Sequence, residues 1–387
     1  MSTSANHIHA TLGPEDTLIT QPIGDFTTEA GATIIDATVA YHRWGEPLKD
    51  GQPCSIKEAD NVVLIEHALT GDSNARLWWE GVIGPGQAID TDHFLVLCAN
   101  VLGGCYGSTG PSSPHPEDGR AWGSRFPALS IRDLVRAEHQ WLDVLEVRHL
   151  YAVIGGSMGG ARALEWSYLY PEFLCSALVM AVSARASSWQ IGIQSSQIAA
   201  ITNDAAWNKG DYYHTSLHPD SGLATARRIA HLTYRGELEL DERFGADAQP
   251  GENPLGPYWR RDQRFAIDSY LDYQAKKLVE RFDAGSYVIL TDALNRHDIG
   301  RGRGGLNKAL GAIEVPVMVV GVDTDILYPY HQQEHLSRNM GKLMAMSKIS
   351  SPVGHDAFLT ETRQVSNIIR RFFSLAQLET PIQHPPE

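Results

Sequence analysis

The sequence predicts an α/β protein organised around one mostly parallel β-sheet that helices cover on both faces. Short apolar runs, each of the length of a buried strand, alternate with longer stretches in which apolar residues recur at helical spacing. The hydrophobic content of 43% and the charged content of 20% are typical of a globular protein with a buried core. A chain of 387 residues can keep one such sheet if part of its length forms an insertion.

The first third of the chain supplies the first strands. Residues 1–30 are polar and are expected to be irregular, whereas residues 32–44 alternate enough to predict a partly exposed strand. Residues 61–67 and 93–99 are apolar runs typical of buried parallel strands. Residues 100–113 are too rich in glycine and serine for regular structure, and they lack the G-x-x-x-x-G-K-[ST] pattern of a nucleotide-binding P-loop.

An amphipathic helix is predicted for residues 130–147. Ser130 is a good N-cap, and Asp133 stands at the position that completes a capping box. The helix leads into an apolar run at residues 151–156, after which another helical stretch follows, and residues 176–182 then form the next buried strand. The alternation of strand and helix predicts parallel strands.

The pattern changes in the middle of the chain. From about residue 184 to residue 304 the apolar residues fall at helical spacing, with turn-rich interruptions, which predicts a helical insertion. Strands are expected again at residues 315–320 and 343–349, followed by a helix at 361–375 and a loose tail at 378–387. The expected division is a sheet core in two parts with a helical insertion between them: 1–183, 184–304 and 305–387.

Composition excludes several classes of function. The net charge is −14 and no lysine- or arginine-rich run offsets it, which argues against nucleic-acid binding. The N-terminal residues lack a basic, then apolar, secretory pattern, and no apolar stretch is long enough to span a bilayer, so we expect a cytoplasmic protein. The four cysteines show no paired spacing, so we expect neither disulfides nor a metal site.

Ser157 has the sequence surroundings of a catalytic nucleophile. It lies in the pattern Gly155-x-Ser157-x-Gly159, between a predicted strand and a predicted helix. In this pattern a sharp turn holds the serine in a strained backbone conformation with its hydroxyl exposed. The pattern alone is also found in ordinary glycine-rich turns, so the interpretation depends on finding a base, an acid and an oxyanion hole.

Later strand ends offer the base and the acid. Asp323 and Asp325 follow the strand expected at 315–320, and His355 follows the strand expected at 343–349. This is the chain order nucleophile, acid, histidine that belongs to the α/β-hydrolase arrangement, and either aspartate fits it. Imidazole can take the proton of a serine hydroxyl near neutral pH, and a carboxylate stabilises the imidazolium that forms.

An oxyanion hole requires two backbone N–H groups. One comes from the residue after the nucleophile, which is Met158, and the other from a loop after an earlier strand. The loop that follows residues 61–67 is correctly placed, and Leu69 is its expected donor.

Taken together, these residues resemble the homoserine O-acetyltransferases of the α/β-hydrolase superfamily over nearly the whole chain. The resemblance implies an α/β-hydrolase fold with an inserted helical lid. It is carried by five motifs: His67-Ala68-Leu69-Thr70-Gly71-Asp72-Ser73, Gly107-Ser108-Thr109-Gly110-Pro111, Gly155-Gly156-Ser157-Met158-Gly159-Gly160, Asp323-Thr324-Asp325 with Leu327-Tyr328-Pro329, and Gly354-His355-Asp356.

The resemblance also implies roles for individual residues. Asp325 is the catalytic acid, which leaves Asp323 as a turn or supporting residue. Within the segment 222–235, Arg227 is expected to bind the carboxylate of the amino-acid substrate, and Tyr234 to belong to the same binding site. Asp356 is expected to bind the ammonium group. A zwitterion needs one cation and one anion to orient its hydroxyl, so the pairing is chemically reasonable.

The activity implied is transfer of the acetyl group of acetyl-CoA to the hydroxyl of L-homoserine, in methionine biosynthesis, by a ping-pong mechanism through acyl-Ser157. Acetyl-CoA is then a co-substrate and no cofactor is bound. Alternatives are a succinyl-CoA-dependent transferase acting on homoserine or serine, and an esterase with the same triad. The family also implies a homodimer through the lid helices. CoA phosphates need positive charge, for which Arg296, Arg301 and Arg303 are candidates; the alternative is that they are ordinary surface arginines.

Overall fold

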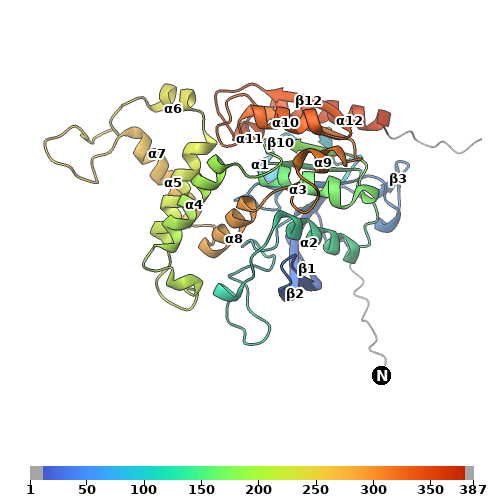
Figure 1. Ribbon diagram of the computed structural model, residues 1–387, viewed down its shortest axis with the longest axis horizontal. Coiled ribbons are helices and arrows are strands. Elements are labelled where there is room, and N and C mark those ends of the chain that lie inside the picture. The colour runs from blue at the N-terminus through green and yellow to red at the C-terminus, as the bar shows by residue number, and fades with distance from the viewer. Residues whose placement is uncertain (1–11, 380–387) are drawn as a thin grey trace, which may run out of the picture.

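The computed structural model describes residues 12–379, and its centre is an eight-stranded sheet in the order β1-β2-β8-β5-β9-β10-β11-β12 (Figure 1). The pairs β1–β2 and β2–β8 are antiparallel, and every pair from β8 to β12 is parallel. The strands are β1 (Ile19–Thr27), β2 (Thr33–Trp44), β5 (Val62–Glu66), β8 (Leu95–Ala99), β9 (Ala152–Gly156), β10 (Ala177–Met180), β11 (Val317–Val322) and β12 (Leu343–Ile349). The mostly parallel sheet predicted from the sequence is confirmed.

Helices cover both faces of this sheet. Along β5, Val62 and Leu64 pack into one apolar cluster, while Val63 and Ile65 pack into another on the opposite face. Because successive side chains of a strand point to opposite faces, a run of apolar residues without alternation is what a strand covered on both sides requires. The covering helices are α1 (Ala75–Trp78), α2 (Ile131–Val144), α3 (Met158–Leu169), α9 (Leu306–Gly311), α10 (Tyr330–Asn339), α11 (Ala357–Thr360) and α12 (Thr362–Glu379).

The structure differs from the sequence predictions at both ends of the chain. The irregular segment expected at residues 1–30 is wrong in part, because β1 forms the edge of the sheet at residues 19–27. Its pairing with β2 is interrupted by register shifts around Gly24, and one side of the strand is exposed, so its hydrophobic alternation is weak. The expected tail begins at residue 378, whereas α12 continues to residue 379; residues 380–387 lie outside the described part.

The capping of α2 agrees with its sequence. The Ser130 hydroxyl accepts a hydrogen bond from the Asp133 N–H, and the Asp133 carboxylate accepts one from the Ser130 N–H, which together form the predicted capping box. The helix thus begins at a fixed residue and delivers the chain to β9, the strand that ends just before Ser157.

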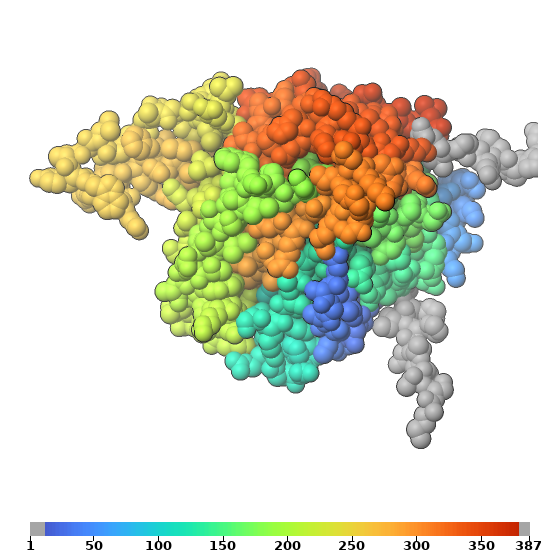
Figure 2. Space-filling model, viewed as in Figure 1, coloured from blue at the N-terminus to red at the C-terminus, as the bar shows by residue number. Residues whose placement is uncertain are grey.

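Residues 184–304, which we call the lid segment, are helical and contribute no described strand to the eight-stranded sheet. Its helices gather beside the sheet, and the stretch between α6 and α7 extends away from the body on the left of both views (Figures 1 and 2). They are α4 (Ser188–Thr202), α5 (Asp220–Tyr234), α6 (Glu237–Phe244), α7 (Ala266–Val279) and α8 (Ala284–Asn295). The insertion's limits at 184 and 304 stay a prediction.

Candidate active site

Ser157 occupies a sharp turn between β9 and α3. Its φ of 59° and ψ of −121° are strained for a residue with a side chain, at a cost of about 1–3 kcal/mol. A Cβ atom on Gly159 would lie well inside van der Waals contact with the Glu66 carbonyl, so the turn can approach β5 only with glycine there. The serine is therefore held in its turn by the packing of two strands and a helix.

Three side chains from three strand ends form a continuous hydrogen-bonded chain. His355 Nε2 lies 2.9 Å from Ser157 Oγ, and His355 Nδ1 lies 2.6 Å from Asp325 Oδ2. All three side chains are buried, and Ser157 is 7% exposed. Since a carboxylate only accepts, Nδ1 carries the proton, and Nε2 is free to accept the serine proton. The structure thus brings together the three residues predicted as nucleophile, base and acid.

The two aspartates left open by chain order have different surroundings. Asp325 turns one oxygen to His355, and its other oxygen accepts the N–H groups of Leu327 and Tyr328, each at 2.8 Å. Asp323 instead accepts the Ser351 N–H at 3.2 Å and lies 3.9 Å from the Lys348 ammonium. Only Asp325 faces the imidazole, and its two backbone donors fix the carboxylate in that orientation.

The surroundings of His355 favour its protonated form. Burial on its own lowers the pKa of the imidazole, but the charge of Asp325, its hydrogen bond and the charge of Asp356 outweigh that effect and raise the pKa above its ordinary value. Aromatic rings of Tyr234, Tyr328 and Phe358 surround the imidazole at centroid distances of 5.8, 5.4 and 5.5 Å. A base with a raised pKa in an apolar enclosure is suited to take and return one proton.

The expected oxyanion donors are buried N–H groups without acceptors. Leu69 is 5% exposed and Met158 is fully buried, and neither backbone N–H donates a hydrogen bond to any group within residues 12–379. Buried N–H groups without partners are rare in folded proteins. Met158 also opens α3, whose N-terminus has no side-chain cap, so the positive end of the helix dipole lies at this turn.

Sequence reasoning did not single out two residues that hold the loop carrying Leu69. The buried His67 ring binds the Ala68 carbonyl, and Arg281, from the α7–α8 connection, donates to the Thr70 carbonyl at 2.8 Å and to the Tyr106 hydroxyl at 2.5 Å. The motif His67-Ala68-Leu69-Thr70-Gly71 could have pointed to His67. No sequence pattern links Arg281 to a loop 211 positions away.

The three residues expected to bind the amino acid lie around the base. The Arg227 guanidinium stands over the Tyr234 ring at 5.5 Å from its centroid, and the Tyr234 ring adjoins His355. Asp356 follows His355, and burial raises the pKa of its carboxyl even though His355, Arg227 and Arg235 act to lower it. The Nε atom of Arg227 is buried and has no hydrogen-bond partner among the described residues. Asp356 is thus the chain neighbour of the base, and the Arg227 guanidinium lies over a ring that adjoins the base.

The arginines expected to meet CoA phosphates are already engaged. Arg296 pairs with Asp292 at 2.6 Å, Arg301 with Glu29 at 2.8 Å, and Arg303 with Glu165 at 2.8 Å. Arg303 also lies over the Tyr168 ring, with 8% of its side chain exposed. These pairings neutralise the positive charge that a phosphate would require, so the structure does not favour the expectation.

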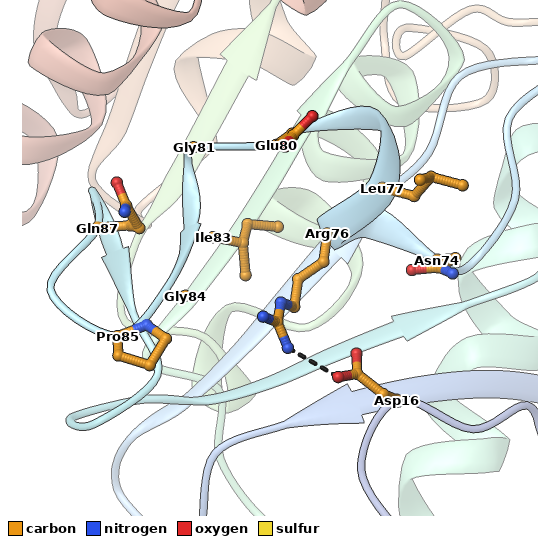
Figure 3. A pocket seen from close by; sticks show the side chains of 10 residues that line it. All are labelled: Asp16, Asn74, Arg76, Leu77, Glu80, Gly81, Ile83, Gly84, Pro85 and Gln87. Atoms are coloured by element: carbon orange, nitrogen blue, oxygen red, sulfur yellow. Dashed lines mark hydrogen bonds and ion pairs between the residues drawn. The ribbon is translucent and has the colours of Figure 1, made fainter.

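The largest of the described cavities lies apart from this constellation. It has a volume of about 610 Å³ and is lined by Asp16, by residues of α1 and by the short strand Ile83–Gly84 with the turn after it, with no triad residue in its wall (Figure 3). Within it Arg76 is ion-paired with Asp16 at 2.8 Å. Among residues 12–379 no helix is long and apolar enough to cross a membrane, and no group of three or more His, Cys, Asp or Glu side chains could hold a metal ion.

Comparisons with known proteins show the family of the chain. A family model described as alpha/beta hydrolase fold matches residues 61–362. The homoserine O-acetyltransferase of Corynebacterium efficiens is 68% identical over 364 residues, which cover 94% of this chain and 95% of that protein. Among crystal structures, homoserine O-acetyltransferase from Bacillus anthracis matches with a TM-score of 0.81 and 25% identity over 92% of this chain and 97% of that one. Esterase E22 matches with a TM-score of 0.81 and 26% identity over 92% and 99%.

Proposed function

The chain belongs to the homoserine O-acetyltransferases, a family with the α/β-hydrolase fold, and from this premise we propose how it transfers an acetyl group to the hydroxyl of homoserine in methionine biosynthesis. The observation that carries the proposed mechanism is the hydrogen-bonded chain from Ser157 through His355 to Asp325, together with the buried residues Leu69 and Met158, whose N–H groups have no acceptor in the described part of the chain. A nucleophile, a base, an orienting acid and an oxyanion hole are the parts that acyl transfer requires.

The first step is acylation of the serine. His355 Nε2 takes the proton of Ser157 as Oγ attacks the thioester carbonyl of acetyl-CoA, and the carbonyl oxygen becomes an oxyanion bound by the N–H groups of Leu69 and Met158. Collapse of this intermediate breaks the carbon–sulfur bond. The CoA thiolate takes the proton from the imidazolium and leaves, and the acetyl group stays on Ser157 as an ester.

The second step repeats the chemistry with homoserine as nucleophile. His355, neutral again, takes the proton of the homoserine hydroxyl, whose oxygen attacks the acetyl-Ser157 carbonyl through the same oxyanion hole. The serine oxygen leaves with the proton from His355, which gives O-acetyl-L-homoserine and restores the free enzyme. Water is the competing nucleophile, and the apolar rings around His355 favour transfer by limiting its access.

Recognition of homoserine rests on opposite charges beside the base. In this proposal Arg227, whose guanidinium lies over the Tyr234 ring, binds the carboxylate, and Asp356 binds the ammonium group. The unpartnered Nε of Arg227 supports this assignment, because a buried guanidinium nitrogen without an acceptor is expected to find one in a ligand. With both ends held, the hydroxyl reaches the acyl carbon in one orientation.

We take acetyl-CoA as the acyl donor and propose that no cofactor is bound. Succinyl-CoA differs by one carboxylate, and serine differs from homoserine by one methylene, so steady-state rates for both donors against both acceptors are the deciding measurement. The proposal requires acetyl-CoA with homoserine to give the highest kcat/KM. A higher value for succinyl-CoA would assign the enzyme to the related succinyltransferases, and hydrolysis unaffected by homoserine would make it an esterase.

The test of the mechanism is Ser157→Ala. Loss of the nucleophile should lower the rate of CoA release by at least roughly 10⁴-fold, with the fold intact by circular dichroism. In the wild type, rapid mixing with acetyl-CoA alone should release a burst of CoA equal to the enzyme concentration, and mass spectrometry should find the acetyl group on the peptide containing Ser157. CoA release at nearly the wild-type rate by Ser157→Ala would contradict the mechanism.

We further propose a homodimer formed through the lid helices. Large apolar side chains are exposed on this part of the chain, among them Trp189 at 57%, Leu232 at 43% and Tyr273 at 57%. Exposed apolar side chains of this size on the lid helices support association through these helices. Sedimentation equilibrium should give twice the chain mass of 42.6 kDa, and Leu232→Glu should shift the population toward monomer.

A further inference from the structure

The buried ring of His67 uses both of its nitrogens, and neither contact is explained by the proposed mechanism. Nδ1 lies 2.7 Å from the Ala68 carbonyl oxygen, and Nε2 lies 3.2 Å from the backbone nitrogen of Val101. A carbonyl only accepts and a backbone N–H only donates, so the ring must be the neutral tautomer that carries its proton on Nδ1. His67 therefore connects the loop after β5 to the loop after β8.

The carbonyl that His67 holds belongs to the same peptide unit as the Leu69 N–H. In a trans peptide the C=O of one residue and the N–H of the next point in opposite directions. The Ala68 oxygen accepts two hydrogen bonds, from His67 Nδ1–H and from the Gly71 N–H at 2.9 Å. With the oxygen held by two donors, the Leu69 N–H is directed to the other side, where it has no acceptor within residues 12–379.

The preceding peptide is fixed as well. Arg162, on the helix that begins just after Ser157, donates from Nη2 to the His67 carbonyl at 2.6 Å. Its Nη1 lies 2.5 Å from carboxylate oxygens of Glu66 and Glu138 in a cluster with no exposed side chain. The same guanidinium thus links the helix of the nucleophile to the loop that carries the second oxyanion donor.

The surroundings of His67 keep its ring neutral. Burial and the positive charge of Arg162 lower the pKa of the imidazole to about 3, and the hydrogen bond to the Ala68 carbonyl offsets only part of this effect. The proton on Nδ1 and the acceptor at Nε2 are therefore both retained over the whole range in which His355 works as a base. A charged ring would lose its bond to the Val101 N–H.

We propose that His67 is a positioning residue for the oxyanion hole: its Nδ1–H fixes the Ala68–Leu69 peptide so that the Leu69 N–H faces the developing oxyanion. The inference rests on the proposed acyl-transfer function and deepens it. It assigns to His67 no proton transfer and no contact with substrate. Its effect falls on the tetrahedral intermediate and on the transition states that lead to and from it, because the oxyanion is absent from the bound substrate, and so it lowers the barrier without strengthening substrate binding.

Two substitutions of His67 test the roles of its Nδ1 and Nε2 atoms separately. His67→Asn places an amide N–H close to the position of Nδ1 and loses the Nε2 acceptor, whereas His67→Gln reaches the position of Nε2 and loses the donor to Ala68. We expect His67→Gln to lower kcat for acylation by acetyl-CoA about 10- to 100-fold with KM changed less than threefold, and His67→Asn to stay within about threefold of the wild type. The affinity for a trifluoromethyl ketone that mimics the oxyanion should fall with kcat.

A double-mutant cycle tests the route through Leu69. Leu69→Pro removes the N–H itself, so His67→Gln should cost almost nothing further in that background, whereas a merely structural role would give losses that add. Equal acylation rates for His67→Asn and His67→Gln, or additive losses in the cycle, would overturn the inference. The mechanism itself would still stand on the Ser157→Ala result, so the two failures are distinguishable.

One measurement needs no substitution. The ¹⁵N NMR spectrum of the wild type labelled at histidine, assigned through His67→Asn, should show a neutral ring protonated at Nδ1 from pH 5 to pH 8. A ring protonated at Nε2 could not donate to Ala68 and would overturn the inference even if His67→Gln failed to fold.

Discussion

Asp356 has two proposed effects on the reaction, because it follows the base directly in the chain and is the proposed ligand of the substrate's ammonium group. Its negative charge adds to that of Asp325 in raising the pKa of His355, and the proposed contact with the ammonium group of homoserine uses the same carboxylate. Since His355 must be neutral to accept a proton, its raised pKa means that acylation declines as the pH falls through a midpoint above 6.5, the ordinary value for histidine. One carboxylate thus influences the pH profile and acceptor binding.

Asp356→Asn separates these two effects. The loss of its charge should move the acid midpoint of acylation to lower pH, measured with p-nitrophenyl acetate so that no homoserine is involved. The KM for homoserine should rise about 10- to 100-fold, the equivalent of one hydrogen bond to a charged group. A midpoint that stays in place or rises would contradict the electrostatic account of His355.

Arg227→Lys tests recognition of the substrate carboxylate. Lysine keeps the charge and loses the planar fork that can bind a carboxylate through two parallel hydrogen bonds and stack on Tyr234. We expect the KM for homoserine to rise about tenfold or more, while the acetyl-CoA burst is unchanged in size and rate. Arg261→Lys, at an exposed position of the lid segment, is the matched control and should leave both quantities unchanged.

A functional residue could be predicted from the sequence where its neighbours in the chain form a recognisable pattern, and not where its role depends on residues distant in the chain. Ser157 and His355 have local patterns at strand ends, and chain order narrowed the acid to Asp323 or Asp325. Those patterns arise because the turn geometry itself demands glycine or a short loop. His67 is in a recognisable motif, but its role depends on the direction of a peptide plane, which side-chain identity does not reveal. Arg281 reaches its partner only through the fold, so no local pattern marks it.

At the scale of elements, the connection between α7 and α8 joins the lid segment to the sheet core through the hydrogen bonds of Arg281, which we call the clasp. The Arg281 side chain leaves the lid and donates to the Thr70 carbonyl and the Tyr106 hydroxyl, which belong to loops after β5 and β8. The clasp therefore ties the position of the lid to the loop that carries the Leu69 N–H.

Arg281→Gln should loosen this clasp. Because the side chain is exposed, we expect the free energy of unfolding to change by about 0.5 kcal/mol or less, while kcat falls about three- to tenfold as the loop becomes less ordered. Hydrogen exchange of the peptide covering residues 67–74 should become faster in the variant. Unchanged exchange together with unchanged kcat would show that Arg281 does not restrain the loop.

The elements themselves were predictable in proportion to their burial. The central strands β5, β8 and β9 lie in apolar runs, because both faces of the sheet are covered, and each was predicted within a few residues. The edge strand β1 was missed, since one face is exposed and a bulge at Gly24 disturbs its alternation. Its formation depends on the length and position of β2, which is information from outside the segment.

For the whole molecule, buried neutral histidines couple stability to pH. The pKa of His67 and of His231 is lowered to about 3, and that of His297 to about 4, in each case mainly by burial. Below about pH 6.5 the unfolded chain binds a proton at each of these residues and the folded chain does not. The contribution of these three histidines to stability therefore decreases as the pH falls toward 4.

Each such histidine contributes a slope of about 1.4 kcal/mol per pH unit between roughly pH 6 and pH 4. Carboxyl groups with raised pKa values, Glu66 and Asp356 among them, make the protein more stable as the pH falls. The contribution of one histidine is therefore measured as the difference between a variant and the wild type. His231→Gln should reduce the slope of the free energy of unfolding by that amount in urea titrations at several pH values. His93→Gln is the control, since the His93 side chain is 76% exposed, and an equal change in both variants would contradict the account.

The residues proposed for the reaction come from two parts of the chain that can change independently in evolution, the sheet core and the lid segment. Ser157, His355 and Asp325 extend from the ends of sheet strands, whereas Arg227 and Tyr234 belong to a lid helix that adds no strand to the sheet. Changes at lid positions that contact neither the Leu69 loop nor His355 can thus alter acceptor binding while the Ser157–His355–Asp325 chain stays in place. Substitutions in the lid can change which acceptor is bound, or admit water in its place, while acylation of the serine is retained. A transferase and an esterase can therefore differ by few substitutions.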